Sequence, residues 1–118
     1  MVRVMIVDDD RTTVKLLQTL LELDGFDVVA VPRGADVLPR IEESKPDIVL
    51  MDYHLSDIHG VEVLRDLRKR AAYAQMPIII TSGMDVEDEA LKAGATTFLL
   101  KPFEPDDLPA LFNRLIAN

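Results

Sequence analysis

Five short apolar runs are spaced along the chain, and each is continuous rather than alternating with polar residues. Most of them are rich in Val and Ile, which is typical of strands that are covered on both faces of a sheet. The predicted strands are Val4–Val7, Val28–Val31, Ile48–Met51, Ile78–Ile80 and Phe98–Leu100. We therefore expect a sheet with both faces buried.

The segments between these runs have apolar residues at helical spacing. The clearest is the last, where apolar residues of 108–116 recur at i, i+3, i+4, i+7 and i+8. Other helices are predicted around residues 14–21 and 61–67 and, more weakly, at Ala35–Glu43 and Val86–Lys92. Pro39 is expected to kink or shorten the helix that contains it. Strands and helices thus alternate five times, which predicts an α/β fold with a parallel sheet between two helical layers.

Composition narrows the class of protein. The 118 residues suit one domain spanning residues 1–118, because single cores usually run to about 100–150 residues. The hydrophobic fraction of 48% argues against disorder, and the net charge of −8 disfavours direct binding of nucleic acid. The sequence has no cysteine, no signal-peptide pattern and no apolar stretch of the roughly 18–20 residues that span a bilayer. We expect a small acidic domain of the cytoplasm that does not bind membranes.

Polar residues that could carry chemistry follow four of the five predicted strands. Asp8 and Asp9 follow the first strand, Asp52 the third, Thr81 the fourth and Lys101 the fifth. Ligands of parallel sheets bind outside the carboxyl ends of the strands, so these side chains are expected to meet at one edge. Crowded carboxylates favour a hard cation such as Mg²⁺, and a carboxylate can also accept a phosphoryl group. A lysine and a hydroxyl would then hold other phosphoryl oxygens.

Each of these residues also has an ordinary structural explanation. An acidic run before a helix, such as residues 8–10, most often caps that helix. Asp52 alone could be a loop acid, Thr81 a hydroxyl at a strand end and Lys101 a solvated lysine. These explanations do not account for the joint occurrence of such residues at the same ends of four parallel strands.

Four segments carry a resemblance to a known family. They are Val7-Asp8-Asp9, Ile48-Val49-Leu50-Met51-Asp52, Ile79-Ile80-Thr81-Ser82 and Phe98-Leu99-Leu100-Lys101-Pro102-Phe103. With these motifs at this spacing, essentially the whole chain resembles the receiver domain of two-component response regulators. The resemblance implies a flavodoxin-like, doubly wound (βα)5 sandwich of three layers, with strand order 2-1-3-4-5.

The resemblance also implies roles for the acidic residues. Asp52 would be the phosphoacceptor and a metal ligand. Asp9 would bind Mg²⁺, or Mn²⁺ in its place, directly, whereas Asp8 would hold the metal mainly through water. The backbone carbonyl of His54 would be a further ligand.

Three more residues match positions of known importance in the family. Lys101 would contact the phosphoryl group, and the Lys101–Pro102 peptide bond is expected to be cis. Thr81 and Phe98 match the two residues that change position on phosphorylation. Phe98 stands where tyrosine is commoner, so its ring lacks a hydroxyl.

The function implied is that of a phosphoacceptor switch rather than a turnover enzyme, although the domain would assist its own phosphorylation and dephosphorylation. The phosphodonor would be a sensor histidine kinase or a histidine phosphotransfer protein. The readout would be the face made by the fourth helix, the fifth strand and the last helix, presented to an effector domain or target protein. The chain is expected to be a free-standing regulator or part of a longer protein.

Two other functions are compatible with parts of the sequence. Residues 8–12 fit the D-x-D-x-T motif of haloacid-dehalogenase-like phosphatases, with Asp8 as nucleophile and Asp10 as general acid. That alternative leaves Asp52 without a role. The other possibility is a pseudo-receiver that is not phosphorylated and acts only as an interaction module.

Overall fold

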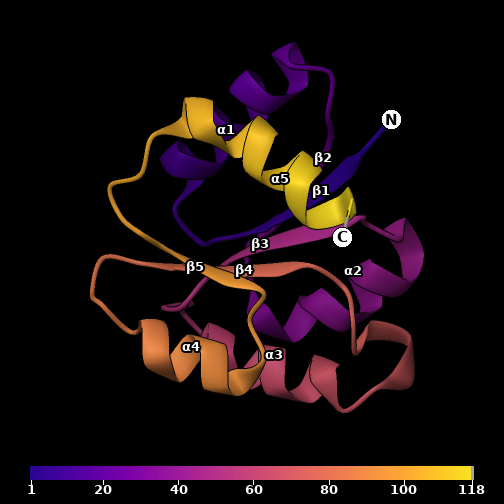
Figure 1. The fold of residues 1–118 in the computed structure, drawn as a ribbon, viewed down its shortest axis with the longest axis vertical. Helices are drawn as coiled ribbons and strands as arrows, with labels where there is room; N and C mark the ends of the chain where they lie inside the picture. Colours follow the sequence, from indigo (N-terminus) through magenta and orange to yellow (C-terminus); the bar gives the residue numbers. More distant parts are fainter. Residues whose placement is uncertain (118) are drawn as a thin grey trace.

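One parallel sheet runs through the molecule between two layers of helices (Figure 1). The structure is a computed structural model that describes residues 1–117, and Asn118, the last residue of the predicted domain, lies outside the described residues. The strands lie in the order β2-β1-β3-β4-β5, which confirms the expected fold and order. They are β1 (Arg3–Val7), β2 (Asp27–Val31), β3 (Ile48–Asp52), β4 (Ile78–Ser82) and β5 (Thr97–Leu100). Each predicted strand is confirmed to within two residues at its ends.

Within residues 1–117, five α-helices and three short 3-10 helices lie between or after the strands. They are α1 (Arg11–Leu23), η1 (Gly34–Asp36), α2 (Val37–Ser44), α3 (Gly60–Arg68), η2 (Ala71–Tyr73), α4 (Glu87–Ala93), η3 (Pro105–Asp107) and α5 (Leu108–Ala117). Helices α1 and α5 cover one face of the sheet, and α2, α3 and α4 cover the other (Figure 1). Among the described residues, no helix combines the length and the apolar character needed to cross a bilayer.

Helix α2 begins later than the sequence pattern predicts. The turn Gly34–Asp36 is a 3-10 helix, and the α-helix begins at Val37, so that Pro39 is its third residue. In the first turn of a helix the backbone N–H groups have no acceptor within the helix, so a proline costs little there. The expected shortening by Pro39 therefore takes place at the start of the helix.

Alternation along the strands separates the core into two halves. In β3, Val49 and Met51 pack with α2, α3 and α4, whereas Ile48 and Leu50 pack with α1 and α5. The expectation that both faces are buried holds for the three central strands. The edge strands β2 and β5 are mostly half-buried, because neighbours cover them on one side only.

Candidate functional site

Three carboxylates meet at the carboxyl edge of the sheet. Asp8 and Asp9 directly follow β1, Asp52 is the last residue of β3, and the register pairs Val7 with Met51 on these neighbouring strands. One oxygen of each carboxylate lies within 4.8 Å of the others. Within residues 1–117, no other group of three His, Cys, Asp or Glu side chains has this geometry. The predicted meeting of these acids is confirmed.

Lys101 and Thr81 complete the same pocket. The Lys101 Nζ lies 3.3 Å from Asp8 Oδ2 and 3.4 Å from Asp52 Oδ1. Thr81 is buried in β4, in register with Asp52, and one small cavity is lined by Asp8, Asp52, Thr81 and Lys101. The Lys101–Pro102 peptide bond is cis, as predicted. All five residues expected at this edge are therefore brought together by four strands.

Electrostatics at this edge are dominated by excess negative charge. Burial raises the pKa of Asp52 above its usual value, and the neighbouring carboxylates of Asp8 and Asp9 raise it further. The Lys101 ammonium acts in the opposite direction, but it contacts two of the three carboxylates and carries a single charge. A cluster of hard oxygen donors whose charge is only partly neutralised fits a divalent cation such as Mg²⁺.

Asp10 has a different structural role from Asp8 and Asp9, which precede it in the acidic run. It is the N-cap of α1, and its Oδ1 accepts hydrogen bonds from the backbone amides of Thr12 and Thr13 at 3.1 and 3.5 Å. A hydrogen bond from the Thr13 hydroxyl adds to these and lowers the pKa of Asp10. The capping explanation therefore holds for Asp10, whereas Asp8 and Asp9 join the cluster.

Two residues that support the site were missed by the sequence analysis. A Cβ atom at Gly60 would lie 2.3 Å from the backbone oxygen of Asp52, so only glycine allows α3 to begin against the end of β3. The carboxylate of Asp57 accepts hydrogen bonds from the amides of Gly34 and Ala35 at 3.0 and 2.9 Å. It thereby ties the loop after Asp52 to η1. The only sequence signal was a glycine and an acid in a loop, which is common in any protein.

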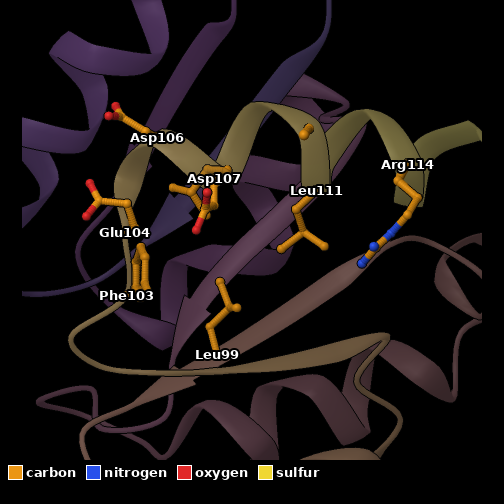
Figure 2. A pocket seen from close by; sticks show the side chains of 9 residues that line it. Leu99, Phe103, Glu104, Asp106, Asp107, Leu111 and Arg114 are labelled. Atoms are coloured by element: carbon orange, nitrogen blue, oxygen red, sulfur yellow. The ribbon is translucent and has the colours of Figure 1, made fainter.

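A second hollow lies between β5 and α5, on part of the predicted readout face (Figure 2). Leu99 and Leu111 form its apolar floor. Its rim carries acidic side chains, namely Glu104, Asp106 and Asp107, together with Arg114. None of the clustered carboxylates lines this hollow, although Phe103 lines both it and the small cavity at the cluster.

The strand order and the acidic pocket at the switch point of the sheet define a flavodoxin-like α/β protein of the receiver type. The family model described as "Response regulator receiver domain" matches residues 4–113. The chain therefore belongs to this family of two-component signalling domains.

Individual relatives agree with this assignment. The alkaline phosphatase synthesis transcriptional regulatory protein PhoP of Bacillus subtilis is 33% identical over 98% of this chain and 49% of its own length. Protein PilH of Pseudomonas aeruginosa is 32% identical over 100% of both chains. The BeF3-activated N-terminal receiver domain of Klebsiella pneumoniae RstA is 30% identical, with a TM-score of 0.90 over 98% of this chain and 99% of that one. The chain thus spans about half the length of PhoP but all of PilH.

Two structural observations bear on the alternative of a haloacid-dehalogenase-like phosphatase. Asp10, its general acid, is engaged as a helix cap, whereas Asp52, which has no role in that mechanism, lies in the cluster. Both observations favour a receiver domain.

Proposed function

We propose that this chain is a phosphoacceptor switch, in which Asp52 accepts a phosphoryl group from a phosphohistidine. The observation that carries the proposal is the contact between Lys101 and Asp52 inside a cluster of carboxylates. An Asp52 carboxylate oxygen forms the new bond to phosphorus, and the bond from phosphorus to the donor imidazole breaks. Lys101 neutralises charge on the phosphoryl oxygens, and the Thr81 hydroxyl donates a hydrogen bond to one of them. The domain thereby assists its own phosphorylation and dephosphorylation without being a turnover enzyme.

The acidic residues would hold a divalent metal ion. The proposed ligands are the carboxylates of Asp8, Asp9 and Asp52 and the backbone carbonyl of His54, with Asp8 acting mainly through water. Bound Mg²⁺, or Mn²⁺ in its place, supplies positive charge next to the transferred group. The three carboxylates support this assignment because a single ammonium leaves them under-neutralised.

The response would be a shift between two packings of the region around α4 and β5. Thr81 is buried at the end of β4, and Phe98 is half-buried on the neighbouring strand against the core shared with α4. Phosphoryl contacts that differ between the two packings shift their populations. The face made by α4, β5 and α5 would then be read by an effector domain or target protein. The phosphodonor would be a histidine kinase or a histidine phosphotransfer protein, and the transfer would take place in the cytoplasm.

The proposal is tested by incubating the protein with acetyl phosphate and Mg²⁺ and locating the label by mass spectrometry. We expect one phosphoryl group on Asp52, and none in Asp52→Ala. A label on Asp8 that survives in Asp52→Ala would support the phosphatase alternative instead. A wild-type protein that binds Mg²⁺ yet takes no label would be an interaction module.

A further inference from the structure

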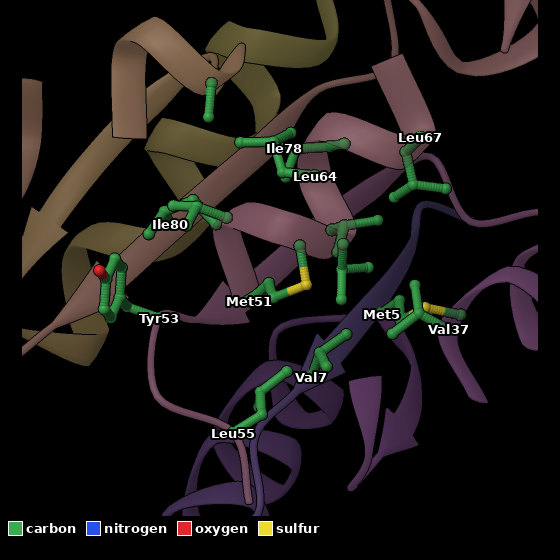
Figure 3. Close-up of a cluster of buried hydrophobic side chains, with 14 of the residues drawn as sticks. Met5, Val7, Val37, Met51, Tyr53, Leu55, Leu64, Leu67, Ile78 and Ile80 are labelled. Atoms are coloured by element: carbon green, nitrogen blue, oxygen red, sulfur yellow. The ribbon is translucent and has the colours of Figure 1, made fainter. Parts of the chain in front are cut away.

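Tyr53, the residue after Asp52, connects the site to α4. Tyr53 belongs to the core cluster under α2, α3 and α4 and is 8% exposed, and its ring lies at one end of that cluster (Figure 3). Its hydroxyl donates a hydrogen bond to Glu89 Oε1 at 2.9 Å. Glu89 lies in the first turn of α4, 36 residues after Tyr53 in the sequence. The hydrogen bond therefore spans from the end of β3 to α4.

The backbone holds Tyr53 in place on both sides. Its amide donates to the Thr81 carbonyl at 2.8 Å, and its carbonyl accepts from the Gly60 amide at 2.7 Å. The His54 and His59 rings also pack against its ring in T-shaped arrangements, with centroid distances of 4.7 and 5.1 Å. The Tyr53 hydroxyl is thus a fixed point, and a displacement of the first turn of α4 stretches its bond to Glu89.

The other end of α4 is anchored separately. Arg68 Nε donates to the Gly94 carbonyl, directly after the helix, at 2.8 Å, and its Nη1 donates to the Tyr73 carbonyl at 2.7 Å. Helix α4 has only seven residues, so these two attachments hold it at its two ends. The attachment at the first turn is the one that lies beside Asp52.

We propose that the hydrogen bond between Tyr53 and Glu89 is a latch that holds the first turn of α4 in the arrangement belonging to a free Asp52 carboxylate. The proposal rests on the phosphoacceptor function of Asp52. In this structure Lys101 contacts the free Asp52 carboxylate directly. The position of α4 that the latch fixes is therefore the one that belongs to Asp52 without a phosphoryl group. When Thr81 and the segment that follows it move toward a phosphoryl group, the latch opens. Tyr53 is thus a positioning residue that opposes activation.

Two properties of the pair suit this role. The Tyr53 hydroxyl is the donor and Glu89 Oε1 the acceptor, at 2.9 Å, so the bond is lost when either group moves or is removed. Phe98, which packs against the same core cluster, has no hydroxyl with which to make a competing bond. Of the aromatic side chains at the two positions, only Tyr53 can form a polar link to the helix.

The test uses beryllofluoride with Mg²⁺ as a stable mimic of the phosphoryl group. We expect Tyr53→Phe and Glu89→Ala each to bind it about threefold to tenfold more tightly than the wild type, because activation no longer breaks a hydrogen bond. The double variant should bind no more tightly than either single variant, because both remove the same bond. Matched controls are Glu87→Ala, an exposed glutamate of the same turn, and Tyr73→Phe at the far end of the sheet; both should behave as wild type.

Hydrogen exchange provides the second readout. Amides of residues 87–90 should exchange faster in Tyr53→Phe, whereas those next to the Arg68 anchor should not change. Unchanged or weaker affinity in both single variants, or additive effects in the double variant, would overturn the latch. A loss of unfolding free energy without tighter binding would identify a merely structural contact and would overturn it too. If the wild type itself fails to bind beryllofluoride, the proposed function fails; if only the variants show no gain, the latch alone fails.

Discussion

The ammonium of Lys101 lies 3.4 Å from Asp52 Oδ1, across the carboxyl edge of a sheet in which β4 separates the two strands that carry these residues. The same ammonium contacts Asp8 at 3.3 Å, so one cation serves two carboxylates that belong to neighbouring strands. Burial and the other acids raise the pKa of Asp52, and Lys101 is the group that opposes them. Lys101 therefore favours the ionised, reactive form of Asp52.

Removing Lys101 should therefore act on Asp52 in two ways. In Lys101→Met we expect the pKa of Asp52 to rise, because the neighbouring positive charge is lost while burial remains. Labelling by acetyl phosphate should slow about 100-fold or more, since a charge-stabilising donor is missing. Carboxyl-carbon NMR titration and the rate of mass labelling measure the two effects. Lys92→Met, an exposed lysine of α4, is the control, and an unaltered Asp52 titration in Lys101→Met would contradict the argument.

Asp9 and Asp10 offer a matched pair of adjacent acids. We expect Asp9→Asn to weaken Mg²⁺ binding at least about tenfold, because it removes one charged oxygen ligand from the cluster. Asp10→Asn should leave Mg²⁺ affinity nearly unchanged, since asparagine also caps helices well. Titration calorimetry with MgCl₂ compares the two variants. An equal loss of affinity in both would mean that general surface charge, rather than the cluster, attracts the ion.

Gly60 should tolerate no side chain. Intrinsic helix propensity favours alanine over glycine in the first turn of α3, but a Cβ atom would lie 2.3 Å from the Asp52 carbonyl oxygen. We expect Gly60→Ala to lower the free energy of unfolding by about 1–3 kcal/mol, as overpacking does in closed sites. Gly83→Ala, where a Cβ atom meets nothing within 4 Å, should cost nothing measurable. Urea denaturation gives both values, and similar values for the two variants would refute the steric explanation.

Asp57 should make a pH-dependent contribution to stability. Its hydrogen bonds from the Ala35 and Gly34 amides lower its pKa, so the folded protein binds fewer protons at this carboxyl than the unfolded chain does. Its stabilisation is complete above the unfolded value of 3.8 and is lost as the pH falls through the lower folded value. We expect Asp57→Ala to cost about 1–2 kcal/mol at pH 7 and progressively less below pH 3.8.

Denaturant unfolding across that pH range measures this contribution. Asp36→Ala is the control, because Asp36 lies in η1 but its side chain makes no capping hydrogen bond. A cost for Asp57→Ala that stays constant with pH would show that the ionised carboxylate is not what the two amides recognise.

The sequence by itself determined the elements and the residues at the edge of the sheet. Continuous apolar runs and helical periods predict five strands and five helices, because one-dimensional patterns report burial directly. Because parallel strands end at the same edge of a sheet, the pattern also predicts that Asp8, Asp52, Thr81 and Lys101 meet, and the structure brings them together. The strand order came from the resemblance of the motifs to a family, since local patterns carry no information on which strands are neighbours.

Only the tertiary structure decided which role each of several chemically similar residues has. Composition is the same along the acidic run, yet Asp10 caps α1 while Asp9 joins the cluster, because the chain turns between them. The roles of Asp57 and Tyr53 depend on partners more than 20 residues away, the amides of η1 and the Glu89 carboxylate. Such contacts exist only when the sheet has brought distant segments side by side, which no local pattern records.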